Sequence, residues 1–257
     1  MPGTSGPGAV TRSTLRQQIA DALRDEVLAG RLQPGQEFTV KEIAEQYGVS
    51  ATPVREALVD LSAQGLLEAD QHRGFHVQQC SPADFREMIE ARGLVTDGMF
   101  RALAERAGSV GAAAGAGTAA VPDGAGPAAG RAAPHAPLYP WTAATLAGVR
   151  RRGEEAQRAA TAGDLTVLIG YDLRFWRELS ALFGNAYLAD FLHRLRVQSW
   201  VYAVQHLRGL GDLRGLLWSG HTELVDALAQ RDIPTARAII AAHHAHSLGL
   251  ADRPAGA

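Results

Sequence analysis

The sequence has one cysteine, Cys80, among its 257 residues. One cysteine excludes a disulfide bond within the chain and is typical of proteins in a reducing cytoplasm. No apolar run approaches the ~18 residues that a membrane-spanning helix needs, and the first residues lack the apolar core of a signal peptide. These absences predict a cytoplasmic protein with no membrane partner.

The chain also lacks an excess of positive charge. Its formal net charge is −2 at pH 7, and acidic side chains outnumber basic ones between residues 12 and 79. Such a surface offers no general positive field to the phosphates of a nucleic acid. If these residues bind DNA, a few well-placed cations must supply the affinity, and a dimer would present each of them twice.

Large apolar side chains are scarce in residues 108–140, where nearly every residue is Ala, Gly or Pro. Such a segment buries too little apolar surface to offset the entropy lost on ordering it. We interpret it as a flexible low-complexity insertion within a second domain, and residues 1–11, rich in Gly, Pro and Ser, as a disordered tail. The whole chain is still 46% hydrophobic, which is enough for two ordinary cores.

A stretch that begins at Thr39 carries the pattern of a winged helix-turn-helix. Thr39 and Glu42 have the spacing of a capping box, which predicts the start of a first helix, and Gly48 marks its end. Two short strands of a wing are expected further on, at residues 66–67 and 75–77. This shape is typical of proteins that insert a helix into the major groove of DNA.

The second helix of the motif is expected to follow a cap at Ser50 or Thr52. Pro53 is expected at its first position, because the amide hydrogen that proline lacks would have no partner within the helix there. Gly65 is expected to end the helix in the left-handed conformation. One side of this helix is apolar. The opposite side, which carries Arg55, is left free to face another molecule.

Between residues 82 and 250 the apolar residues recur at helical spacing, and no strand-like alternation appears. Asp164, Asn185 and Asp232 stand where helix N-caps belong. The predicted fold is therefore mainly α. It has an N-terminal winged helix-turn-helix with a two-stranded wing over residues 12–79, and a C-terminal all-helical bundle over residues 82–250.

The run from Ser50 to Leu58, Ser-Ala-Thr-Pro-Val-Arg-Glu-Ala-Leu, is followed by Gly-Leu-Leu at residues 65–67 and by Arg73-Gly74. This order is similar to the DNA-binding domain of the GntR family of bacterial transcription regulators. The resemblance implies double-stranded operator DNA as a partner, with contacts from Lys41, Ser50, Thr52, Arg55, His72, Arg73 and Gly74. Ala51 departs from the family, which commonly has an arginine there that touches DNA.

The second domain is similar to the all-helical FCD domain of the FadR branch of this family, which binds small-molecule ligands. The matching pieces are Asp172-Leu173-Arg174-Phe175, Gly184-Asn185 with Leu188, His221, and Ala236 with His243. Family members often bind a divalent metal through an aspartate, a histidine four residues later and two further histidines. The predicted domain of this type covers residues 82–250 and includes the insertion.

Asp172, His221 and His243 match three of those four metal ligands, and Trp176 stands where the fourth is expected. The resemblance implies a weakened site for zinc or nickel, metals that suit imidazole and carboxylate ligands. It also implies an effector pocket formed by Arg92, Asp172, Trp176, His221 and His243. In the competing interpretation, the two histidines are hydrogen-bonded core residues and Trp176 is ordinary core packing.

As a whole, the resemblance implies a ligand-responsive transcription regulator, not an enzyme, that binds an operator as a homodimer and senses a small organic acid or related metabolite. Two alternatives stay open. One is a metal-dependent enzyme in which Asp172, His221 and His243 activate a water molecule. The other is a DNA-binding dimer that has lost its effector because Trp176 fills the old pocket.

Overall fold

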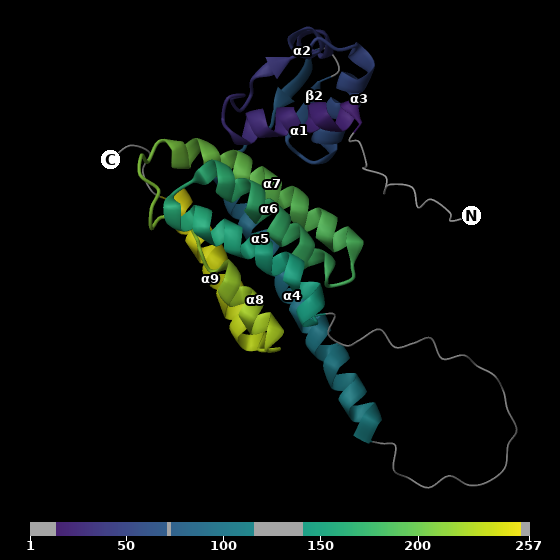
Figure 1. Ribbon diagram of the computed structural model, residues 1–257, viewed down its shortest axis with the longest axis vertical. Helices are drawn as coiled ribbons and strands as arrows, with labels where there is room; N and C mark the ends of the chain where they lie inside the picture. Colours follow the sequence, from purple (N-terminus) through teal and green to yellow (C-terminus); the bar gives the residue numbers. More distant parts are fainter. Residues whose placement is uncertain (1–13, 71–72, 116–140, 253–257) are drawn as a thin grey trace, which may run out of the picture. The chain divides into compact units, whose positions relative to one another are not determined.

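The computed structural model describes residues 14–70, 73–115 and 141–252. The chain divides into two compact units, residues 1–79 and 80–257. The described ranges are mainly helical, with one small sheet in the first unit, which confirms the fold class predicted from the sequence (Figure 1). No helix in these ranges is long and apolar enough to cross a membrane.

The first unit is built around a helix whose inner face is fully buried. Its described elements are α1 (Leu15–Leu28), β1 (Glu37–Phe38), α2 (Val40–Tyr47), α3 (Ala51–Ala63), β2 (Leu67–Asp70) and β3 (Gly74–Val77). α3 packs against α1, α2 and β2, because Val54, Ala57, Leu58 and Leu61 lie along one of its faces and are buried. This packing fixes α3 so that its polar face stays exposed.

The predicted ends of the two central helices are found in the structure. Thr39 Oγ1 accepts a hydrogen bond from the Glu42 N–H (3.2 Å), and Glu42 Oε2 accepts one from the Thr39 N–H (2.7 Å), which is a complete capping box before α2. Gly48 follows α2 in the left-handed conformation, with φ +64°. Gly65 has φ +77° just after α3, so both glycines act as predicted.

The start of α3 differs from the prediction. The N-cap is Ser50 and the first helical residue is Ala51, so Pro53 occupies the third position and not the first. The Ser50 side chain makes no capping hydrogen bond. A serine cap normally accepts from the second or third amide of the helix, and Pro53 has no amide hydrogen to give.

The wing has three strands and not the predicted two. The strand order is β1-β3-β2, and all pairings are antiparallel. Glu37 pairs with His76 and Phe38 with Phe75, so β1 completes the sheet just before the helix-turn-helix. Two residues are too few to show the alternation typical of a strand. β1 can therefore be recognised only from its pairing with β3.

The second unit is a bundle of helices. They are α4 (Pro82–Gly115), α5 (Ala143–Ala162), α6 (Leu165–Ala181), α7 (Ala186–Arg208), α8 (His221–Ala229) and α9 (Ile233–Ala251). Asp164, Asn185 and Asp232 each accept a hydrogen bond from the backbone N–H three residues later, which confirms the predicted caps. α5 packs on α6 and α8, α6 packs on α7, and α4 packs on α7 and α9.

α4 extends further than the sequence indicates. Residues 108–140 were interpreted as a flexible insertion, but α4 continues to Gly115. Alanine has the highest intrinsic helix propensity, and this favours continuation of a helix that has already started. Residues 116–140 and the expected tail at residues 1–11 lie outside the described ranges.

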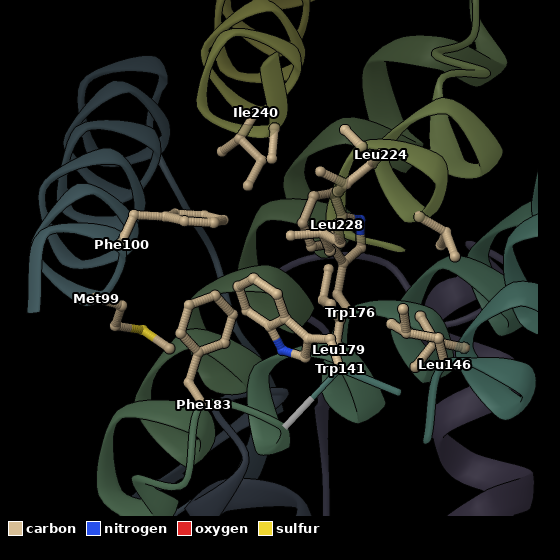
Figure 2. Packing of buried hydrophobic residues seen from close by; sticks show 14 of the residues in the cluster. Met99, Phe100, Trp141, Leu146, Trp176, Leu179, Phe183, Leu224, Leu228 and Ile240 are labelled. Carbon is tan, nitrogen blue, oxygen red and sulfur yellow. The ribbon is translucent and has the colours of Figure 1, made fainter. Parts of the chain in front are cut away.

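A cluster of buried apolar side chains holds the helices of the second unit together. Figure 2 shows Phe100 of α4, Trp176 of α6, Leu224 and Leu228 of α8, and Ile240 of α9 within this cluster. Trp176 is therefore a core residue, as the competing interpretation of the sequence proposed. Its indole nitrogen, however, contacts a buried carboxylate that borders a cavity.

Candidate functional site

The described residues that the resemblance assigned to DNA contact lie on α2, α3 and the wing of the first unit. Lys41 is in the first turn of α2, while Ser50, Thr52 and Arg55 lie at the start of α3, and all four are exposed. The first turns of a recognition helix carry the side chains that reach base edges and phosphates. His72 lies outside the described residues.

Arg55 differs from the other basic residues of the first unit. Among the lysines and arginines of residues 14–70 and 73–79, it alone forms no ion pair. The others pair as follows: Arg16 with Asp60, Arg24 with Asp21, Arg31 with Glu26, Lys41 with Glu45, and Arg73 with Glu37. The guanidinium of Arg55 is thus available for a bidentate contact with a base or a phosphate.

Short-range contacts position Arg73 and Gly74 at the start of β3. Arg73 Nη1 lies 3.2 Å from Glu37 Oε1, and the Arg73 N–H donates to Asp70 Oδ1 (3.2 Å). Gly74 has φ +98°, and a Cβ there would lie 2.8 Å from the backbone oxygen of Phe38. Position 74 therefore needs glycine for the close approach of β1 to β3.

A cavity of about 70 Å³ lies within the second unit. Among its polar lining residues are Arg92 of α4, Asp172 of α6, Arg196 and Ser199 of α7, and His243 of α9. Much of the remaining lining is apolar or aromatic. The structure thus brings Arg92, Asp172 and His243 of the predicted effector pocket to one cavity, and the other two residues, Trp176 and His221, contact Asp172 directly.

Asp172 is buried, with 3% of its surface exposed, and its carboxylate accepts hydrogen bonds on both oxygens. Oδ1 accepts from Trp176 Nε1 (2.9 Å) and from His221 Nε2 (3.0 Å), and Oδ2 accepts from Trp200 Nε1 (2.8 Å). Burial alone would raise the pKa of Asp172. The bonds from His221 and Trp200 and the charge of Arg196 outweigh burial and hold that pKa below its usual value.

A hydrogen bond to Asp172 orients the ring of His221. An ionised carboxylate can only accept, so His221 Nε2 must carry the proton that it donates. Nδ1 is buried and has no hydrogen-bond partner among the described residues. His221 is the first residue of α8, so its hydrogen bond to Asp172 joins α8 to α6.

The predicted metal site is not assembled in the structure. Within residues 14–70, 73–115 and 141–252, no group of three or more His, Cys, Asp or Glu side chains is arranged to hold a metal ion. His221 Nε2 is hydrogen-bonded to Asp172 Oδ1 at 3.0 Å. The ring of His243 packs against Trp176 and Trp218, with centroids 5.1 and 4.5 Å away. Asp172, His221 and His243 therefore do not fit a divalent cation.

Two arginines, Arg196 and Arg92, place positive charge near Asp172. Arg196 Nη1 lies 3.8 Å from Asp172 Oδ2, and Arg92 is close enough for its charge to act on both residues. Burial lowers the pKa of Arg92 to about 10, and the Asp172 charge opposes that shift. Burial also lowers the pKa of His243 well below its usual value, and the charges of Arg196 and Arg92 lower it further. His243 is thus neutral at pH 7.

The sequence reading missed Arg196 and Trp200. Both lie in an apolar segment whose spacing predicts a buried helix face, and Arg196 falls on that face, four residues after the buried Leu192 and eight before the buried Val204. An arginine at a core position of a helix is a detectable signal, because arginine is almost never fully buried without a partner. The partner, Asp172, is on another helix and could not be identified from spacing.

Comparison with known families agrees with the two units. Residues 15–77 match the family described as bacterial regulatory proteins, gntR family, and residues 126–246 match the FCD domain. The solved structure of McbR (YncC) from E. coli is similar to this chain, with a TM-score of 0.65 at 21% identity, over 93% of this chain and 98% of that one. This likeness concerns the fold alone.

Sequence relatives are named as regulators. The probable D-xylose utilization operon transcriptional repressor of Paenarthrobacter nicotinovorans is 42% identical over 83 residues, which are 32% of this chain and 37% of that protein. The HTH-type transcriptional regulator McbR of Escherichia coli (strain K12) is 34% identical over 92 residues, 36% of this chain and 40% of the regulator. The aligned residues thus span less than half of these relatives.

These matches fall on the helix-turn-helix and on the helical bundle that contains the cavity. Residues 15–77 therefore belong to the gntR family of bacterial regulatory proteins, and residues 126–246 belong to the FCD domain family.

Proposed function

We propose that the protein is a ligand-responsive transcription regulator. It binds a double-stranded DNA operator through Lys41, Ser50, Thr52, Arg55 and the wing tip at residues 72–74, and it acts in the cytoplasm, where that DNA lies. The observation that carries this proposal is the exposed polar face of α3, with Arg55 free of ion pairs among the described residues.

The first unit by itself offers few cations to DNA. Acidic residues outnumber basic ones, and most of the described bases already pair with a carboxylate on the same unit. Nanomolar affinity for an operator requires many phosphate and base contacts. We therefore propose that the protein binds as a homodimer, through the FCD-like domain at residues 82–250, with the winged helix-turn-helix at residues 12–79 presented twice.

The effector is proposed to be a small organic acid. The cavity in the second unit is lined by two buried arginines and one buried aspartate, so it holds more positive than negative charge. A cavity of this size also weighs against the alternative in which Trp176 has filled the pocket. The enzyme alternative has no support, since Asp172, His221 and His243 do not fit a metal and the named relatives are regulators.

Selection of DNA from a random library tests this proposal without knowledge of the operator. The expected product is an inverted repeat with half-sites about 10–10.5 base pairs, one helical turn, or a multiple of this apart. Light scattering of the protein, free and on the selected DNA, is expected to give the mass of a dimer. Failure to enrich any sequence, or a monomer in both states, contradicts the proposal.

A further inference from the structure

Trp176 of α6 and Arg196 of α7 form a cation–π contact beside Asp172. Arg196 Cζ lies 4.0 Å from the centre of the Trp176 ring, while its Nη1 lies 3.8 Å from Asp172 Oδ2. An aromatic face attracts a cation, and the attraction is strongest for tryptophan and for desolvated groups. The indole therefore holds a guanidinium beside the carboxylate, in the region where a metal would meet that carboxylate.

The charges around this contact do not cancel. Arg92 and Arg196 are 3% and 7% exposed, and one carboxylate, Asp172, balances them among the described residues that line the cavity. Arg92 Nε and Nη2 are buried and have no hydrogen-bond partner in the described part of the chain. These two nitrogens form one edge of the guanidinium, the edge that matches the two oxygens of a carboxylate. A buried cation without a partner is costly, and a bound anion would remove that cost.

We infer that the cavity binds a small monocarboxylate without a metal ion, and that Arg92 and Arg196 supply the positive charge that a divalent metal would supply. The inference rests on the proposed ligand-sensing function of this unit. One negative charge neutralises the excess of one positive charge that remains after Asp172 is counted. A dicarboxylate would bring a second charge that these three residues leave uncompensated.

The size of the cavity limits the ligand further. A buried water molecule needs about 10–15 Å³ of cavity volume, so about 70 Å³ has room for roughly five to seven groups of that size. Propionate, butyrate and valerate fall in this range, whereas citrate is larger and carries more charge. The apolar part of such an acid would lie against lining side chains such as Ile89 and Leu168.

Acid binding by the full-length protein can be measured by calorimetry and by the fluorescence of Trp200 and Trp218, which line the cavity. We expect butyrate or valerate to bind equally well in the presence and absence of EDTA, and citrate to bind at least tenfold more weakly. Arg92→Gln is expected to weaken butyrate binding at least tenfold. The matched control is Arg177→Gln, an exposed arginine on α6, which should leave binding unchanged.

The zinc content of variants provides a second test, in which the expected result is a gain of metal binding and not a loss of acid binding. The wild type and Trp176→His are both expected to bind less than one tenth of an equivalent of zinc, because Arg196 repels a divalent cation. The double variant Trp176→His/Arg196→Met, in which an imidazole is added and the guanidinium removed, is expected to gain stoichiometric zinc by elemental analysis. Stoichiometric zinc in the wild type or in Trp176→His overturns the inference.

The outcomes separate this inference from the proposed function. Butyrate binding that disappears in EDTA, or an unchanged affinity in Arg92→Gln, contradicts the metal-free site even if the acid still alters DNA binding. Metal-free acid binding that leaves DNA affinity unchanged supports the site and contradicts the proposed regulation. Absence of acid binding in every condition, with and without added zinc, contradicts both.

Discussion

Replacement of Arg55 by alanine is expected to abolish specific operator binding while the fold survives. Arg55 is exposed near the start of α3 and has no ion pair among the described residues, so its loss leaves no buried partner. One bidentate contact to a base is worth about 1–3 kcal/mol, and a dimer makes it twice. The expected loss is about 2–6 kcal/mol, or a roughly 30-fold to 20,000-fold weaker affinity.

The measurement is a gel shift on the selected operator, with circular dichroism of both proteins to show that the helices are retained. Arg158→Ala is a suitable control, since it removes the same charge from an exposed arginine in the second unit, paired there with Glu155. This control should change operator affinity by less than twofold. Equal affinity of Arg55→Ala and the wild type, with matching spectra, would contradict the assignment of α3 as the recognition helix.

Replacement of Asp172 by alanine is expected to destabilise the second unit strongly. The carboxylate is buried and bonded to Trp176, His221 and Trp200, and it balances the charge of Arg196. Breaking a buried ion pair by removing one partner costs about 3–5 kcal/mol, because the other charge is left without a partner. For a unit of this size the melting temperature should fall by about 6–20 °C.

Thermal unfolding followed by circular dichroism checks this result. Asp190→Ala, on the exposed face of α7, should change the free energy of unfolding by less than about 0.5 kcal/mol. The double variant Asp172→Ala/Arg196→Met should recover part of the loss, since it removes the unpaired charge as well. A melting temperature of Asp172→Ala within 2 °C of the wild type would show that the carboxylate does not stabilise the arginines.

The helix-turn-helix could be predicted because its signals are local. The capping box of Thr39 and Glu42, the left-handed glycines and the apolar spacing of α3 all act within a few residues. The third strand of the wing could not be predicted, because Glu37 and Phe38 become a strand only through hydrogen bonds to β3, which lies almost forty residues later. Long-range pairing leaves no periodic trace in so short a segment.

The candidate ligand site could be predicted only in part, because some of its contacts join residues that are far apart in the sequence. Sequence resemblance identified Arg92, Asp172 and His243, which line one cavity, and it identified Trp176 as the departure from the family pattern. It could not show that the indole faces Arg196, because that contact joins α6 to α7. The metal expectation depended on side-chain orientation, and the contacts of His221 with Asp172 and of His243 with Trp176 and Trp218 become known only from the structure.

The central claim, that a small acid in the arginine-lined cavity controls DNA binding, is tested most directly by one titration. The affinity of the protein for its selected operator is measured by fluorescence anisotropy at increasing butyrate or valerate, in the presence of EDTA. Allosteric coupling of about 1–3 kcal/mol predicts that a saturating acid changes the operator affinity roughly 5-fold to 150-fold, and that Arg92→Gln needs at least tenfold more acid for the same change. An operator affinity that stays constant while tryptophan fluorescence reports a saturated cavity would contradict the claim.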